Sequence, residues 1–151
     1  MSDNILPMNG SCRCGRVKIR IGAKPIITMA CHCTGCQKMS SSAFSLSAAI
    51  PTEGFEVTEG EPVIGGLHGA ARHYFCPYCM SWMFTRPDGM DFFVNVRPSM
   101  LADPDKFPPF VETYMSEKLA WAATSAAYSY DKFPPMEDFP RLMQEYAALP
   151  A

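Results

Sequence analysis

Cys31-His32-Cys33-Thr34-Gly35-Cys36 places three thiols within six positions of a 151-residue chain. Two more pairs, Cys12-Arg13-Cys14 and Cys76-Pro77-Tyr78-Cys79, divide the seven cysteines into three clusters. Closely spaced cysteines bring thiolates to one ion without closing a long loop, and Zn²⁺ takes four such ligands in a tetrahedron. The clusters therefore predict metal sites around which the fold is organised.

The two outer pairs together supply the four thiolates of a closed site. We predict that Cys12, Cys14, Cys76 and Cys79 hold one structural zinc ion, which would join the start of the chain to its middle. Two alternatives remain open: buried pairs of reduced cysteines, and a redox pair at Cys76 and Cys79. A redox pair would leave Cys12 and Cys14 without a role.

The middle cluster is one ligand short of a closed site. Structural zinc sites are closed, whereas catalytic sites keep a position open for water or substrate. His32 and His73 are alternative fourth ligands, but His32 lies between two cysteines of an extended segment and would point the opposite way. An iron–sulfur cluster would need one more free cysteine. We therefore predict a catalytic zinc ion on Cys31, Cys33 and Cys36, the more labile of two ions per chain.

The charge of such a site predicts its chemistry. Zn²⁺ on three thiolates carries one net negative charge, so it would generate hydroxide poorly. A metal does deprotonate a coordinating thiol outright. The sulfur of an external thiol in the fourth position would stay nucleophilic and attack a carbon electrophile, and the reverse reaction would be carbon–sulfur cleavage. Thiol activation is the predicted reaction type.

Composition excludes several other classes. The length suits one domain with its own core. The sequence contains no run of about 18 apolar residues, so no membrane span is predicted. Residues 1–10 lack a basic start and an apolar stretch, so we expect the reducing cytoplasm rather than secretion. The net charge of −2 argues against nucleic-acid binding. Residues 1–52 are nevertheless basic, which favours either solvated strand faces or a small anionic ligand.

Period-two alternation predicts a mostly β fold of short antiparallel strands. Apolar residues alternate with polar ones over residues 17–21, 44–50 and 55–58, and further strands are expected at 26–30, 71–75, 81–85 and 92–96. The last fifty residues contain seven prolines, and only 140–149 has helical spacing. We predict a domain over 8–125 and an irregular C-terminal extension, 126–151, packed on it. Exposed sheet edges are consistent with a homodimer.

Three stretches resemble a known family: Gly10-Ser-Cys12-Arg-Cys14-Gly15, Cys31-His-Cys33-Thr-Gly-Cys36-Gln37 and Phe75-Cys76-Pro-Tyr-Cys79. They are similar to the glutathione-dependent formaldehyde-activating enzymes, a family that includes centromere protein V. The resemblance implies a β-tent fold around a structural zinc ion on the four outer cysteines and a catalytic zinc ion on the middle three. It also implies addition of glutathione to formaldehyde, giving S-hydroxymethylglutathione, a reaction classed with the carbon–sulfur lyases.

The resemblance leaves the substrate and one turn open. Phe44 and Trp121 match aromatic positions of the family, and Gln37 and Lys38 follow Cys36, so these four are candidate substrate contacts; core packing and exposed polar positions are the alternatives. Met80 stands where the family usually has glycine. A left-handed turn at this position would be unstrained with glycine but strained with Met80. The competing function is a zinc-stabilised binding module without catalysis, which the lack of a concentrated basic tract disfavours.

Overall fold

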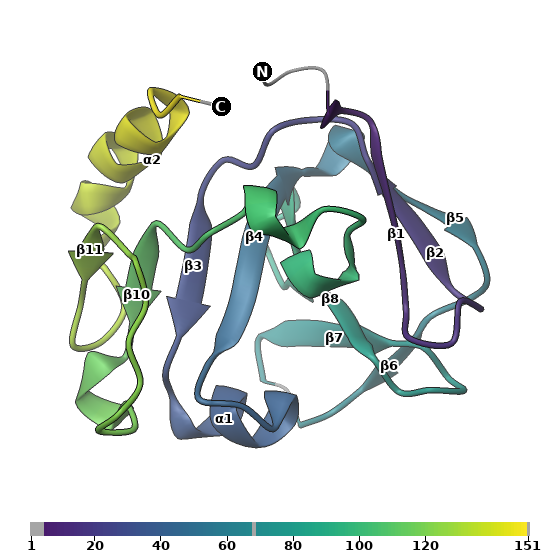
Figure 1. Cartoon of the computed structure of the whole chain (residues 1–151), viewed down its shortest axis with the longest axis horizontal. Helices are drawn as coiled ribbons and strands as arrows, with labels where there is room; N and C mark the ends of the chain where they lie inside the picture. The colour runs from purple at the N-terminus through teal and green to yellow at the C-terminus, as the bar shows by residue number, and fades with distance from the viewer. Residues whose placement is uncertain (1–4, 68, 151) are drawn as a thin grey trace.

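The computed structural model describes residues 5–67 and 69–150. Residues 1–4, which are part of the N-terminal segment expected to lack a secretory signal, lie outside these ranges, as do His68 and Ala151. Within these ranges, eleven strands form two sheets (Figure 1). The small sheet has the order β1 (Met8–Ser11), β2 (Lys18–Ile21), β5 (Phe55–Glu59). The large sheet has the order β11 (Tyr128–Ser129), β10 (Val111–Thr113), β3 (Thr28–Cys31), β4 (Ser45–Pro51), β9 (Phe93–Val96), β8 (Trp82–Pro87), β7 (Ala71–Phe75), β6 (Val63–Gly65).

The mostly β prediction and the β-tent fold are confirmed, with one difference in strand direction. Most neighbours are antiparallel, as the short alternating strands predicted. Strand β10, however, pairs in parallel with both β3 and β11. Parallel neighbours need long crossover connections. Residues 32–110, which include β4 to β9, connect β3 to β10, and the irregular segment 114–127 connects β10 to β11.

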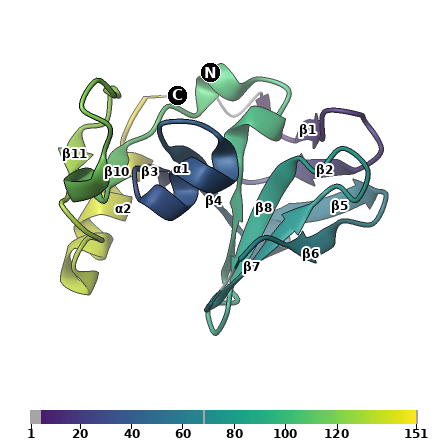
Figure 2. The same ribbon diagram turned by 90° about the horizontal axis from the view of Figure 1, so that it is seen from below.

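The main core lies between the two sheets. Ile19 and Ile21 of β2 and Phe55 of β5 pack in one buried cluster with Phe84 of β8 and Val96 of β9. Figure 2 shows the small sheet lying over the β6–β8 part of the large sheet. The polar members of the alternating β2 segment face outward, and its apolar members Ile19 and Ile21 are buried in the core between the sheets.

Among the described residues, two α-helices accompany the sheets. Helix α2 (Phe139–Ala147) matches the predicted helix, and its Leu142 is fully buried in a second core cluster with Val111 of β10. Strand β11 joins the large sheet, so the tail contacts the same body, while the boundary at residue 125 stays a prediction. Helix α1 (Thr34–Ser40) was not predicted; its seven residues bury no side chain, which leaves no apolar period to detect.

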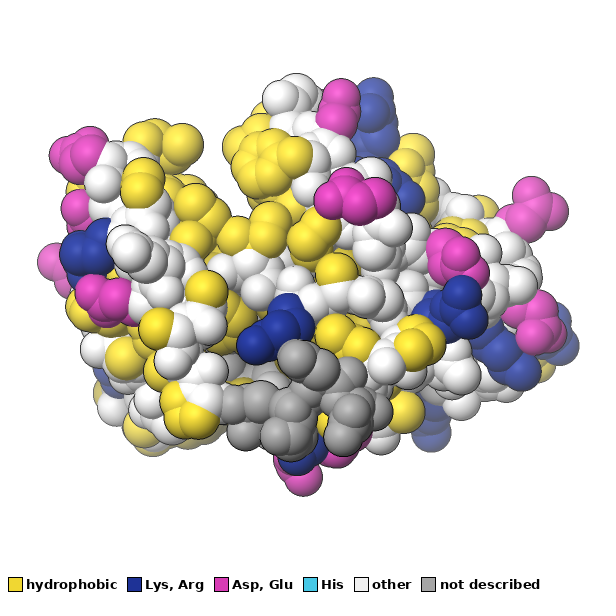
Figure 3. Space-filling view, turned by 90° about the horizontal axis from the view of Figure 1, so that it is seen from above, with side chains coloured by type: hydrophobic (Ala, Val, Ile, Leu, Met, Phe, Trp, Pro, Cys, Tyr) yellow, Lys and Arg dark blue, Asp and Glu magenta, His cyan; other side chains and the backbone are white. Residues whose placement is uncertain are grey.

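The basic residues of β2 are paired with acids and do not form a separate binding site for an anionic ligand. Lys18 lies 3.5 Å from Glu59 and Arg20 lies 3.7 Å from Glu56, so acidic side chains of β5 form ion pairs with the basic side chains of β2. On the face in Figure 3, acidic and basic side chains lie mainly at the two ends, and hydrophobic ones gather between them. No helix within the described residues is long and apolar enough to cross a membrane.

Candidate metal centres and the adjacent cavity

Two groups of cysteines meet in space, as their spacing predicted. Cys12 and Cys14 lie in the turn between β1 and β2, and Cys76 and Cys79 lie in the turn between β7 and β8. The four sulfur atoms all lie within 4.8 Å of one another. The group therefore joins the small sheet to the large one at their turns.

The sulfur separations fit a tetrahedral ion. The Sγ atom of Cys14 lies 3.6 Å from that of Cys12 and 3.7 Å from that of Cys76. Zinc–sulfur bonds of about 2.3 Å place the corners of a tetrahedron about 3.8 Å apart. A hydrogen bond with Ser81 lowers the pKa of the Cys79 thiol to about 5, which favours the thiolate that a metal needs. The group of four thus has the spacing and the chemistry of a closed zinc site.

Met80 adopts the strained backbone that its position implied. Its φ is +61°, and its N–H donates to the Cys76 carbonyl at 2.9 Å, so it completes the turn in the left-handed region where glycine is favoured. A left-handed conformation costs a non-glycine residue about 1–2 kcal/mol. The turn therefore keeps its geometry at the expense of stability.

Met80→Gly is expected to stabilise the zinc-loaded protein by about 0.5–1 kcal/mol, since the relief of strain exceeds the entropy of a more flexible unfolded chain. Urea denaturation would measure the change. Met136→Gly is the matched control, because Met136 is also exposed but its φ is not positive. Equal destabilisation by both substitutions would contradict the strain at Met80.

The other three cysteines converge at the start of α1. Cys31 ends β3, Cys33 caps α1 by accepting the Cys36 N–H at 3.3 Å, and Cys36 lies in the first turn of the helix. Their sulfur atoms also lie within 4.8 Å of one another. The capping geometry places Cys33 and Cys36 on the same side as Cys31, and no fourth Cys, His, Asp or Glu of the described residues joins them.

The three thiols cannot ionise independently. The Cys36 thiol lowers the pKa of Cys31 to about 5, whereas Cys31 raises the pKa of Cys36, and a hydrogen bond from Ser45 opposes that rise. One thiolate thus forms easily and the later ones are held back by its charge. A divalent cation would remove this penalty, so the group fits a metal ion with one position left for another ligand.

His32 points away from the three cysteines into the core, as predicted. It is fully buried, and its Nε2 donates to the Glu112 carboxylate at 2.9 Å. Thr124 and Ser129 donate to the same carboxylate at 3.0 and 2.8 Å. Burial raises the pKa of Glu112, but the bonds from His32, Ser129 and Thr124 outweigh it and lower the pKa overall. The loop that carries the cysteines is therefore anchored to β10.

Glu112→Gln is expected to destabilise the fold by about 1–3 kcal/mol at pH 7, because it weakens a buried network. The lowered pKa means that the stability from the ionised Glu112 is complete above its unfolded pKa of about 4.3 and disappears as the pH falls through the folded value. Urea denaturation at pH 7 and pH 4 should show the difference between variant and parent narrowing in acid. The control is Glu59→Gln, which removes an exposed ion pair and should change little. A difference that does not depend on pH would contradict the ionised carboxylate.

A cavity of about 380 Å³ lies beside the three-cysteine group. Its lining includes Phe44, Ser45, Trp82 and Arg97, and Ser45 is the cross-strand neighbour of Cys31. It also reaches Ser81 beside Cys79, so it lies between the two cysteine groups. The volume is within the range of small-ligand pockets.

The four predicted substrate contacts lie in different places. Phe44 lines the cavity, and its ring centroid is 5.2 Å from that of His32. Gln37 donates to the His32 and Glu117 carbonyls at 2.8 and 3.0 Å, so its amide braces the cysteine loop. Lys38 is exposed, and Trp121 is 76% exposed; neither lines this cavity. Their roles in substrate binding stay predictions.

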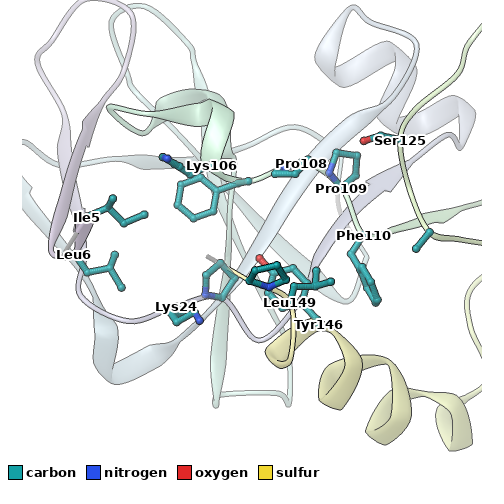
Figure 4. A pocket seen from close by; sticks show the side chains of 14 residues that line it. Ile5, Leu6, Lys24, Lys106, Pro108, Pro109, Phe110, Ser125, Tyr146 and Leu149 are labelled. Atoms are coloured by element: carbon teal, nitrogen blue, oxygen red, sulfur yellow. The ribbon is translucent and has the colours of Figure 1, made fainter. Parts of the chain in front are cut away.

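Two cavity residues, Arg97 and Trp82, were missed from the sequence. Both lie in or next to strands whose alternation indicated only sheet structure, and nothing local in the sequence links them to the cysteines. A second cavity, of about 350 Å³, lies between α2 and the segment 106–110 (Figure 4). No cysteine of the described residues lines either cavity, but Ser45 and Ser81 place the first one next to the two cysteine groups.

The fold and the two cysteine groups define a small β protein with two candidate metal centres. The family model for the glutathione-dependent formaldehyde-activating enzyme matches residues 7–117, so the chain belongs to this family. No curated protein matches the chain. A crystal structure of a Rhodobacter sphaeroides protein has a similar fold, with a TM-score of 0.50 and 19% sequence identity over 63% of this chain and 88% of that one.

Proposed function

We propose that the protein is a zinc-dependent enzyme of the carbon–sulfur lyase type. It binds a thiol, glutathione or a similar one, at the three-cysteine group and adds it to a small electrophile such as formaldehyde, or releases it. The observation that carries the proposal is the pairing of a closed four-cysteine group with a three-cysteine group that opens beside a cavity. Membership of the family supports both the thiol and the aldehyde.

The residues of the two groups divide the work. Cys12, Cys14, Cys76 and Cys79 would hold a structural zinc ion, and Cys31, Cys33 and Cys36 a second one. When bound at the open group, zinc supplies a position that deprotonates an incoming thiol. Helix α1 and the buried His32–Glu112 pair keep the three sulfur atoms converged before any ligand arrives.

The cavity residues position the electrophile. Phe44, Leu46 and Trp82 give it apolar walls, and the hydroxyl group of Ser99 can donate to a developing oxyanion. The thiol loses its proton, and its sulfur forms a bond to the carbonyl carbon. The π electrons of the carbonyl group move to oxygen, which takes up a proton. The product is an S-hydroxymethyl thioether when the aldehyde is formaldehyde.

A thiol-and-aldehyde screen by exchange NMR tests this function. We expect glutathione or another cellular thiol, paired with formaldehyde or another small aldehyde, to exchange with its adduct faster with the zinc-loaded protein than without it. Equal exchange rates across the whole panel would leave the non-catalytic binding module as the better description.

A further inference from the structure

Arg97 is held rigidly at the wall of the cavity. Its Nη1 donates to the Leu46 carbonyl at 2.8 Å, and its Nη2 donates to the Thr85 hydroxyl at 2.9 Å. Its guanidinium carbon lies 3.7 Å from the centroid of the Trp82 ring. Trp82 itself donates to Thr85 at 3.1 Å, so the stack and the hydrogen bonds fix one another. The guanidinium group cannot turn away from the cavity without breaking this network.

The charge of Arg97 has no carboxylate partner. None of the ion pairs formed by the described residues includes it. Its Nε is buried and has no hydrogen-bond partner among them. A buried cation is costly unless an anion compensates it. The structure therefore provides a fixed, partly buried positive charge that has no acidic partner among the described residues.

The sheet topology places this charge next to the cysteines. Leu46, which accepts the bond from Nη1, follows Ser45, and Ser45 lies opposite Cys31 across β3 and β4. Burial lowers the pKa of Arg97 to about 10, and the charges of Cys36 and Cys31 oppose that fall. Arg97 and Ser45 line the same cavity, so the guanidinium group lies on the side of the cavity that adjoins the open group.

We propose that Arg97 is the counter-ion of the three-cysteine group, and that it favours entry of a fourth, substrate-derived thiolate. This rests on the proposed function. Three thiolates and a divalent ion carry one net negative charge, and a fourth thiolate would raise it to two. A fixed cation at the cavity wall offsets that second charge in a partly dry site. The site would then select for the thiolate itself rather than for carboxylates elsewhere on the thiol, and neutral thiols would benefit as much as glutathione.

The test uses the full chain loaded with Co²⁺ in both groups. The visible bands of the cobalt ions report on ligand change, and only the open group can respond to an added thiol. β-Mercaptoethanol and glutathione would be titrated into the parent, Arg97→Gln, Arg97→Lys and Arg86→Gln. Arg86 is the matched control. Its guanidinium carbon also lies near aromatic rings, 5.5 and 5.6 Å from the centroids of Phe55 and Phe84. Arg86 follows Thr85 in β8, so its side chain lies on the opposite face of the strand.

We expect Arg97→Gln to raise the apparent Kd of both thiols by about tenfold or more. Arg97→Lys, which keeps the charge, should stay within about threefold of the parent, and Arg86→Gln should match it. The proposal is overturned if Arg97→Gln binds β-mercaptoethanol as tightly as the parent, or if its loss is confined to glutathione. If Arg97→Gln fails to hold both cobalt ions, Arg97→Lys alone decides. A folded Arg97→Lys whose apparent Kd for the thiols rises tenfold would also overturn the proposal. If the bands of the parent respond to neither thiol, the proposed function itself fails.

Discussion

Cys76→Ser is expected to leave the chain largely unfolded, whereas Cys31→Ser is expected to remain folded. Cys76 is fully buried and belongs to the group that joins the turns of the two sheets. Structural zinc contributes on the order of 10–16 kcal/mol in small zinc-binding peptides, which matches or exceeds the whole stability of a typical domain. Cys31 lies at the end of β3 and belongs to neither core cluster, so we expect the core to form without an ion at its group.

Far-UV circular dichroism, tryptophan fluorescence and zinc content would measure this pair of variants. Cys31→Ser should keep the parent spectrum and hold one zinc ion per chain instead of two. The two substitutions are chemically identical, so each is the control for the other. Equal loss of structure in both would contradict the division into a structural and an open group.

Cys36→Ser is expected to slow thiol addition by at least about 100-fold with little change in the fold. Removing one of three sulfur ligands weakens the ion at the open group, and metal assistance is worth several kcal/mol in comparable reactions. Cys36 is only half-buried and lies on a short helix that buries no side chain, so the core is not disturbed. Exchange NMR on glutathione and formaldehyde would measure the rate.

Mild chelation gives a control that needs no substitution. A chelator at low concentration should remove the ion from the open group first, because three protein ligands hold it less firmly than four. Activity should fall together with half of the bound zinc, and added zinc should restore it, while the circular dichroism spectrum stays constant. Activity that survives the loss of the weaker ion would place the reaction elsewhere.

The sequence predicted the cysteine groups well because their information is local. Cys12 and Cys14, and Cys76 and Cys79, are so close in sequence that each pair must share one turn. The alternation of Ile19 and Ile21 with charged neighbours likewise fixed the buried face of β2. In both cases the signal extends over fewer than six residues and needs no knowledge of the partner strand.

The missed features depend on contacts between distant segments. Arg97 lies on the same part of the sheet as Cys31 and Cys36 only because β9 and β3 flank β4, an order that no local pattern encodes. Glu112 anchors His32 across 80 positions of sequence. Helix α1 was missed for another reason: it forms by capping at Cys33 rather than by burying an apolar face.

The central claim is that the three-cysteine group takes a thiol as its fourth ligand. X-ray absorption at the zinc edge, on protein with both groups filled, measures it most directly. Four and three protein sulfur atoms give an average of 3.5 sulfur ligands per zinc ion without added thiol. The account predicts that saturating glutathione, or the thiol selected by the screen, raises the average to 4. The added sulfur would replace the oxygen or nitrogen ligand that fills the fourth position of the open group without thiol. An average that stays at 3.5 at saturating thiol would contradict it.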